Sequence, residues 1–245
     1  MTIIAKNLRY GPSKIVTDGL VLYLDAANKQ SYPGSGTTWT DLSGRGNNGT
    51  LLNGVGYSSS NGGSLVFDGI NDYVQLTSAN YYTETIIVWG KSNNAVWSGS
   101  GSGNGYEGLS SSRRTNGHSF HTNSGSTSIT FFLGLSGTDS NFNSLHAVGT
   151  LSPDNIQIPH MYVCSTNGLD SHKAYLDGQL LLTSTTTISR DSNTVQRNWR
   201  MGRADFPPQA RYTSVTIYSV QKYNRQLTDT EVQQNFNALR GRFGI

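Results

Sequence analysis

Turn residues recur so often along this chain that they leave room for short strands and for little else. Short apolar runs rich in Val, Ile, Tyr and Thr are separated about every 8–12 residues by Gly, Asn, Asp and Ser. The clearest case is AYLDGQLL, where Asp177-Gly178 between two apolar runs indicates a tight hairpin. The pattern predicts an all-β protein, built as a two-sheet antiparallel sandwich.

The C-terminal sequence LTDTEVQQNFNALRG predicts one short helix at the end of the sandwich. Thr228 and Glu231 have the spacing of a capping box, and Leu227 is placed for a hydrophobic staple. Gly241 is expected to end the helix. Its apolar face, which we expect to pack on a sheet, consists of Val232, Phe236 and Leu239.

Composition narrows the class of protein further. The chain has 245 residues, of which 35% are hydrophobic, enough for one core. A net charge of +3 is too weak for a nucleic-acid surface. Cys164 is the only cysteine, so we expect a buried thiol and no intrachain disulfide. There is no run long enough for a membrane span and no secretory signal pattern, so we expect cytosolic synthesis without membrane insertion.

The chain divides into an N-terminal arm, residues 1–17, and one domain, residues 18–245. The arm is mildly basic and contains apolar residues that could add a strand to the edge of a partner's sheet. The C-terminal RGRFGI offers two more apolar side chains. The candidate docking residues are Ile3, Ile4, Leu8, Tyr10, Phe243 and Ile245.

Several stretches occur in an order that matches a known family. They are GLVLYLDAAN, DLSGRGNNGTL, GSLVFDGINDYV, AYLDGQLL, RMGRA, and KYNRQL followed by the predicted helix. Together they resemble the concanavalin A-like jelly-roll domains of LamG and pentraxin type, over roughly residues 19–241. The variant is most similar to LamG-like modules of tailed-phage virion proteins from marine and cyanobacterial phages. The resemblance implies a jelly-roll sandwich.

The resemblance also implies a function. It suggests a non-enzymatic virion structural protein, a capsid decoration or a tail-associated protein, assembled in the host cytoplasm. Its partners would be other virion proteins or further copies of itself, docked through the termini. The alternative is a lectin-like, carbohydrate-binding module for host-surface glycans, and both roles can coexist in one protein.

Enzyme chemistry has little support in the residues. A glycoside hydrolase needs two carboxylates facing one bond, and the three glutamates, Glu84, Glu107 and Glu231, share no strand. The nucleophile-elbow pattern G-x-S-x-G does not occur. His118 and His121 would point to opposite faces of an extended strand, which disfavours a zinc site. We therefore expect no catalytic activity.

The stretch FDGINDYV has two interpretations. Gly69 suits a tight turn closed by Asx side chains, which is the interpretation we favour. Calcium is the alternative, because LamG and pentraxin domains often bind it at one rim, with Asp68, Asn71 and Asp72 as candidate ligands here. No other cofactor is expected. Further oxygen donors that could lie near are Asp25, Asp41, Asn47 and Asn48.

A glycan site would need exposed aromatic side chains. Trp97 and Tyr106 lie in or next to a Gly- and Ser-rich stretch, residues 95–128, and are the candidate sugar contacts. The alternative is that they anchor this stretch. The stretch itself is either a functional loop or a set of short hairpins with wide turns.

Overall fold

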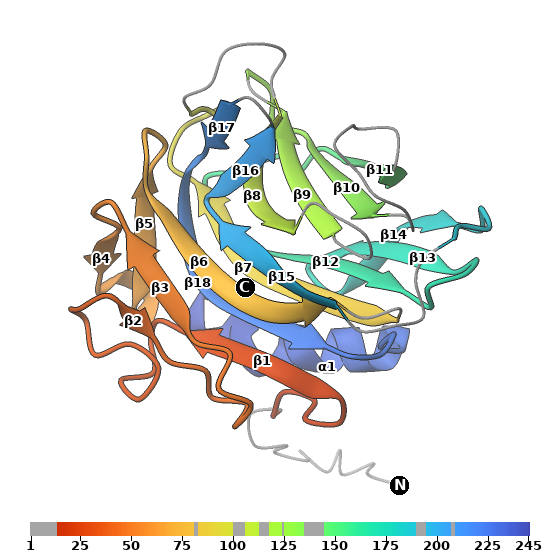
Figure 1. Ribbon diagram of the computed structural model, residues 1–245, viewed down its shortest axis with the longest axis horizontal. Helices are drawn as coiled ribbons and strands as arrows, with labels where there is room; N and C mark the ends of the chain where they lie inside the picture. The colour runs from red at the N-terminus through yellow and green to blue at the C-terminus, as the bar shows by residue number, and fades with distance from the viewer. Residues whose placement is uncertain are drawn as a thin grey trace, which may run out of the picture.

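The computed structural model describes residues 14–80, 83–99, 106–112, 118–123, 125–134, 145–189, 195–206 and 209–245. Two large antiparallel sheets face each other (Figure 1). The order in sheet A is β14 (Gln179–Ser184), β13 (His172–Leu176), β12 (His160–Thr166), β7 (Glu84–Ser92), β18 (Ser214–Tyr223), β5 (Ser64–Asp68) and β4 (Gly56–Ser58), and β1 (Leu20–Asp25) pairs with β18.

Sheet B completes the sandwich. Its order is β11 (Leu145–Leu151), β10 (Ile129–Gly134), β9 (His118–Asn123), β8 (Tyr106–Ser112), β15 (Val195–Met201), β6 (Tyr73–Asn80), β3 (Gly49–Leu52) and β2 (Thr38–Trp39). A separate hairpin joins β16 (Arg203–Phe206) to β17 (Gln209–Tyr212). One 3₁₀ turn, η1 (Ser60–Gly62), precedes β5. The predicted antiparallel sandwich is confirmed.

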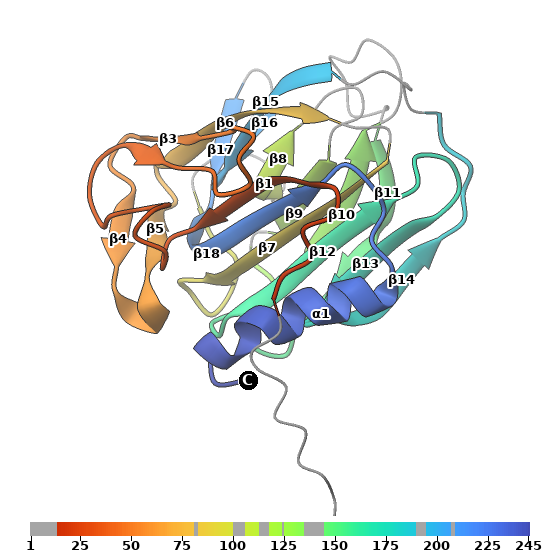
Figure 2. The same cartoon turned by 90° about the horizontal axis from the view of Figure 1, so that it is seen from below.

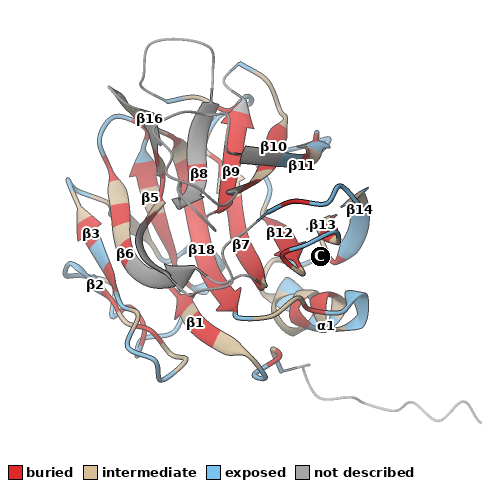
Figure 3. Cartoon of the chain, turned by 45° about the vertical axis from the view of Figure 1, so that its right-hand side comes forward, coloured by how far each residue is buried: buried red, intermediate tan, exposed pale blue. Residues whose placement is uncertain are grey.

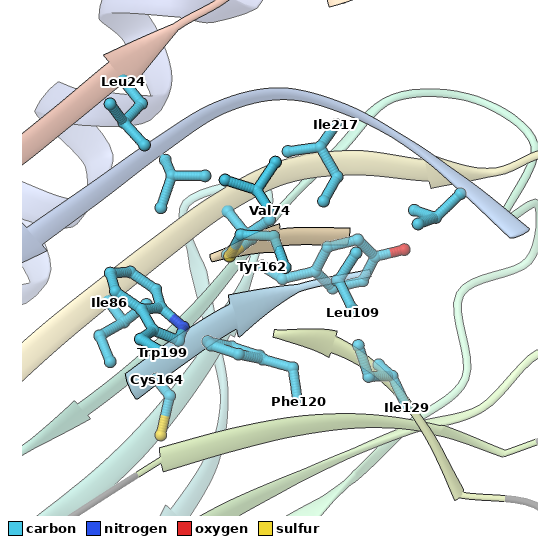
Figure 4. Close-up of a cluster of buried hydrophobic side chains, with 14 of the residues drawn as sticks. Leu24, Val74, Ile86, Leu109, Phe120, Ile129, Tyr162, Cys164, Trp199 and Ile217 are labelled. Carbon is cyan, nitrogen blue, oxygen red and sulfur yellow. The ribbon is translucent and has the colours of Figure 1, made fainter. Parts of the chain in front are cut away.

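The main core lies between the two sheets, as the close-up in Figure 4 shows. Strand alternation decides which side chains enter it. On β7, Ile86 and Val88 belong to this core, whereas Ile87 and Trp89 belong to a second cluster on the other face of the sheet. Cys164 is buried in the main core, as predicted. Figure 3 shows that β7 and β18 are buried along most of their length.

The second cluster forms where the helix α1 (Asp229–Leu239) covers the outside of sheet A (Figure 2). The predicted capping box is present: Thr228 Oγ1 accepts from the backbone N–H of Glu231 at 3.3 Å, and Glu231 Oε2 accepts from that of Thr228 at 2.9 Å. The predicted apolar face is also confirmed. Its members, with Leu227 of the staple, are Val232, Phe236 and Leu239.

The end of the helix differs from the prediction. Gly241 does not end it, because the chain continues as a 3₁₀ turn, η3 (Arg240–Arg242), and the positive φ of 73° falls at Gly244. At the other end of the chain, Val16 N donates to Asn235 Oδ1 at 2.8 Å and the Val16 side chain is buried. The packed part of the chain therefore includes the last residues of the expected arm. Among the described residues, no helix is long and apolar enough to cross a membrane.

The described part of the Gly- and Ser-rich stretch includes two strands of sheet B, β8 and β9. β8 pairs with β9, and β9 pairs with β10, both antiparallel. The Asp177-Gly178 hairpin forms as predicted, with positive φ at both residues, 52° and 80°.

Acid should weaken the attachment of the helix. The hydrogen bonds of Arg225 hold the pKa of Glu231 at about 2, below its ordinary value of 4.5. Because the folded-state pKa is depressed, this stabilisation is complete above pH 4.5 and is lost as the pH falls towards 2. We expect Glu231→Gln to lower the free energy of unfolding by about 1 kcal/mol at pH 6. The melting temperatures of the two proteins should converge near pH 2.

The matched control for this experiment is Asp154→Asn, which removes an exposed carboxylate from the loop before β12. Its melting curve should follow that of the unchanged protein at both pH values. A gap between Glu231→Gln and the unchanged protein that stays constant from pH 6 to pH 2 would contradict this account.

Candidate functional site

Three chain segments meet around the first residue of β18, at one end of the sandwich. Ser214 pairs with Asp68 at the end of β5. Ser214 N donates to Ser98 O at 2.8 Å, and Asn93 N donates to Ser214 O at 3.3 Å. Asn93 Nδ2 also donates to Phe67 O at 3.1 Å. The β5–β6 turn, the segment after β7 and the start of β18 are therefore fixed to one another.

The β5–β6 turn is the FDGINDYV stretch, and its Asx side chains close it. Asp68 Oδ1 accepts from the backbone N–H of Ile70 at 2.7 Å and of Asn71 at 3.3 Å. Asp72 Oδ2 accepts from Asp68 N at 3.2 Å. Gly69 has a φ of 79°. The turn interpretation is confirmed, and both carboxylates are used within it.

Calcium binding at this turn stays a prediction. Calcium takes six to eight oxygen ligands, and among the described residues no three His, Cys, Asp or Glu side chains gather as a metal-binding group. Burial raises the pKa of Asp72. Asp25 is bound by Arg242 Nη1 at 2.7 Å. Asp41 organises its own loop, accepting from the backbone N–H groups of Tyr23, Ser43 and Asn47 and from the Ser43 hydroxyl.

A different side-chain group stands beside this turn. The register of β6 with β15 pairs Val74 with Met201. Gly202 then turns the chain out of sheet B with a φ of 76°, where a Cβ would lie 2.5 Å from a ring carbon of Phe67. Gly202 N donates to Leu109 O at 3.2 Å. Only glycine suits this position, because the conformation and the close approach both exclude a side chain.

The bend at Gly202 brings an arginine against two tyrosines. Arg203 pairs with Tyr212 across the β16–β17 hairpin, and Tyr73 begins β6. The Arg203 Cζ lies 4.7 Å from the Tyr73 ring centroid and 5.5 Å from that of Tyr212. The two ring centroids are 6.3 Å apart, with the rings tilted by 49°. All three residues are partly exposed. We call Tyr73, Arg203 and Tyr212 the rim site.

The β5–β6 turn, which leads into Tyr73, carries an exposed apolar residue. Ile70, at the tip of the β5–β6 turn, is 66% exposed, the highest value among the exposed large hydrophobic residues described. The rim site thus offers two aromatic rings and one planar cation. Such a set can hold a ligand that has both a flat apolar face and polar edges.

Sequence reasoning placed the sugar contacts elsewhere, and for Trp97 it was wrong. The Trp97 side chain is fully buried, and its Nε1–H donates to Thr127 O at 3.1 Å. An indole enclosed in the core cannot stack on a sugar, so Trp97 anchors the stretch, which was the alternative. Tyr106 begins β8, and its side chain lies outside the described part of the structure.

Two of the six expected docking residues, Phe243 and Ile245, lie in the described part of the chain. Phe243 packs within its own chain, with its ring 4.6 Å from that of Trp89 and 4.9 Å from that of Tyr218, so this ring is used internally. Ile245 is 40% exposed. Four expected residues lie outside the described part of the chain: Ile3, Ile4, Leu8 and Tyr10.

The carboxylates considered for catalysis are held in separate places. Glu84 is buried in the core, 3.3 Å from Lys222 Nζ and 3.8 Å from His118 Nδ1. Glu231 is bound by Arg225 beside α1. The side chain of Glu107 lies outside the described residues. The Glu84–Lys222 pair was missed from sequence, because nothing local signals a contact between distant strands.

The two histidines of HSFH lie on opposite faces of β9, as predicted. His118 points into the sandwich, where its ring centroid is 4.9 Å from that of Trp199. His121 points to the other face, with its ring 4.8 Å from that of Phe132. They cannot ligate one metal ion together.

No protein-family model and no curated protein matches the sequence. Solved structures do match the fold. The chain is similar to the binding domain of botulinum neurotoxin DC in complex with SialylT (17% identity, TM-score 0.68). It is also similar to the binding domain of Paraclostridial Mosquitocidal Protein 1 (13%, 0.64) and to Trypanosoma rangeli sialidase in complex with sialic acid (16%, 0.63).

Each match covers 91% of this chain, but only 52% of the two binding-domain chains and 33% of the sialidase. The chain thus spans about half the length of the two binding-domain chains and about a third of the length of the sialidase. At these identities the likeness shows the fold, a concanavalin A-like sandwich with one C-terminal helix. None of the three is a virion protein, and the phage assignment stays a prediction.

The glycine of the β5–β6 turn allows a test of the rim architecture. At Gly69 a Cβ would meet Ser214 N at 2.7 Å, in addition to the strain of the positive φ. Gly46 has a similar φ of 74° with nothing within 4 Å. We expect Gly46→Ala to lower the free energy of unfolding by about 1 kcal/mol and Gly69→Ala by about twice that or more. Urea unfolding measures both, and equal losses would contradict the close packing around Ser214.

Proposed function

We propose that this chain is a non-enzymatic, lectin-like carbohydrate-binding module and that the rim site is its sugar-contacting surface. The observation that carries the proposal is the arrangement of Tyr73, Arg203 and Tyr212. Two partly exposed aromatic rings lie beside a guanidinium at one end of the sandwich.

The chemistry of sugars fits this surface. A pyranose ring has a flat face of C–H groups that can stack on an aromatic ring, and its hydroxyls need hydrogen-bonding partners at the edge. The two tyrosine rings supply the stacking face, and the Tyr hydroxyls and the guanidinium supply the polar edge.

The scaffold also suits a binding surface. Tyr73 is held by the β3–β6 pairing, where it lies opposite Leu52, and Tyr212 by the β16–β17 hairpin, so both rings stand on paired strands. Rigid supports lower the entropy that must be lost on binding.

The structural neighbours support this class of function without transferring any residue. One is a toxin binding domain in complex with SialylT, and another is a sialidase in complex with sialic acid. Identities of 16–17% are too low to align a sugar site. The neighbours therefore support carbohydrate binding only as a class of function. The choice of the rim site rests on the contacts of Tyr73, Arg203 and Tyr212 in this chain.

The absence of catalysis is part of the proposal. Hydrolysis of a glycosidic bond needs two carboxyl groups flanking it. Glu84 is engaged by Lys222 inside the core, and Glu231 is engaged by Arg225 on α1. Asp68, beside the rim site, accepts two backbone hydrogen bonds. Attachment of the module to a phage particle is compatible with glycan binding, and it rests on the sequence resemblance alone.

Glycan binding by the full chain tests the proposal. We expect the unchanged protein to bind a subset of surface oligosaccharides on a glycan array, without releasing reducing ends. Tyr73→Ala and Tyr212→Ala should each weaken binding about tenfold, because each removes a stacking face. Calorimetry with the best array ligand measures the dissociation constants.

Tyr57→Ala is the matched control. Tyr57 is also partly exposed and also contacts a cation, since Lys29 Nζ lies 5.2 Å from its ring centroid, but it belongs to β4. Its loss should leave glycan affinity unchanged. Binding that survives both rim variants, or that is lost equally in Tyr57→Ala, would move the site elsewhere. No binding to any glycan would overturn the proposed function.

A further inference from the structure

We propose that His160, Asp177 and the backbone carbonyl of Asn155 form a pH-sensitive latch, in which a doubly protonated imidazole ring fastens the β11–β12 loop to the β13–β14 hairpin. The loop consists of residues 152–159, and His160 is the first residue of β12. The latch is separate from the rim site, and the inference does not rest on the proposed function.

Both nitrogens of the His160 ring face hydrogen-bond acceptors. The distance from His160 Nδ1 to Asp177 Oδ2 is 2.7 Å, and the distance from His160 Nε2 to Asn155 O is 2.8 Å. A neutral imidazole carries one N–H group, so it can donate to only one of these oxygens, whereas an imidazolium donates to both. The two acceptors therefore favour the protonated ring.

Asp177 is itself held in the position that this contact needs. It lies in the turn of the hairpin with a φ of 52°, and its backbone N–H donates to Met161 O at 3.0 Å. Its other carboxylate oxygen, Oδ1, accepts from the backbone N–H of Met161 at 2.8 Å. Because three hydrogen bonds join Asp177 to the start of β12, the carboxylate cannot turn away from the ring without breaking the turn.

A second histidine shows what a neutral ring needs. His172, at the start of β13, has Nε2 3.1 Å from Thr186 O and Nδ1 2.8 Å from Thr166 Oγ1. The Thr166 hydroxyl accepts from Gly168 N at 2.8 Å and can donate its own proton to Nδ1. One N–H group on the His172 ring is therefore enough for both contacts. The partners of His160 differ, because an ionised carboxylate and a carbonyl only accept.

The ionisable groups near the ring also favour its protonation. Among the described residues, Asp177 is the charged side chain in contact with the ring. The loop itself carries one more carboxylate, Asp154, next to Asn155. The ring centroid of Tyr162, on the same strand, lies 6.0 Å from that of His160. Burial raises the pKa of Tyr162, so its phenol stays neutral.

The neighbouring strand β7 brings no opposing charge to the ring. Gly90 lies opposite His160 in the register and has no side chain, and Lys91 comes next and points to the other face of the sheet. Burial lowers the pKa of His160, but the hydrogen bonds to Asp177 and Asn155 more than offset this effect. The pKa therefore lies above its ordinary value of 6.5.

The raised pKa makes the latch sensitive to alkali. Its stabilisation is fully present below pH 6.5 and is lost as the pH rises through the pKa of the folded protein. The single N–H group of the neutral ring stays with Asp177, because a hydrogen bond to a carboxylate is the stronger of the two. The contact that is released is the one to Asn155. Ile156 keeps the rest of the loop in place, since its side chain is buried in the main core and its carbonyl accepts from Ser92 N at 2.7 Å.

The protonation state of the ring can be measured on the full chain. Nitrogen-15 NMR of histidine side chains distinguishes an imidazolium from both neutral tautomers, and His160→Gln identifies the signals of this ring. We expect the His160 ring to carry both protons at pH 6.5 and to lose one at higher pH. The backbone amide signals of residues 154–155 should change over the same pH range. A ring that is mainly neutral at pH 6.5 would overturn the proposal.

Asp177→Asn separates the charge from the hydrogen bonds. The amide oxygen of the new side chain can accept from Met161 N, and its N–H₂ group can donate to Nδ1 of a neutral His160 ring. The ring then keeps its N–H at Nε2 for Asn155 O. Asparagine also tolerates the positive φ of this position. We expect the variant to fold, with a melting temperature close to that of the unchanged protein at pH 6, and to hold a neutral His160 at pH 6.5.

Hydrogen exchange in the β11–β12 loop measures the release. After correction for the intrinsic effect of pH, exchange of the loop amides should become several-fold faster between pH 6 and pH 8.5 in the unchanged protein. It should stay constant in Asp177→Asn. The matched control is Asp170→Asn, which removes a carboxylate that accepts from Asn167 Nδ2 in the β12–β13 turn, and it should keep the full increase. No increase in the unchanged protein, or an equal increase in Asp177→Asn, would overturn the latch.

Discussion

Strand β18 is the element on which the rest of this structure depends. Its backbone pairs with β1, β5 and β7. Its inner face gives Ile217 and Val220 to the main core, and its outer face gives Tyr218 and Tyr223 to the cluster under α1. A single buried strand therefore contributes side chains to both hydrophobic clusters.

The same strand supports the elements that carry the rim site. Because α1 and its cluster cover the outside of sheet A around β7 and β12, that face is closed. The start of β18 lies at one end of the sandwich, where Ser214 holds the β5–β6 turn and the segment after β7. The rim site stands on this frame. Its three side chains come from elements far apart in the sequence, and backbone hydrogen bonds keep those elements in place.

Local signals in the sequence predicted the local structures well. The Asx turn at Asp68, the Asp177-Gly178 hairpin and the capping box at Thr228 each depend on residues within a few positions. Contacts across the fold could not be predicted in this way. Trp97 sits in a polar stretch and yet is buried, and Arg203 meets Tyr73 only through the register of β6 with β15. The rim site depends on such contacts, so sequence reasoning did not identify its three residues.

Carbohydrate binding at the rim site is the central claim, and its location can be mapped directly. The measurement is an NMR titration of the isotope-labelled chain with the best-binding oligosaccharide, following backbone amide signals. The account predicts that shifts concentrate at residues 68–74 and 202–214. Signals of the Asp177-Gly178 hairpin, which lies on different strands, should stay in place. Shifts that avoid the rim segments, or that concentrate on another face, would contradict the account.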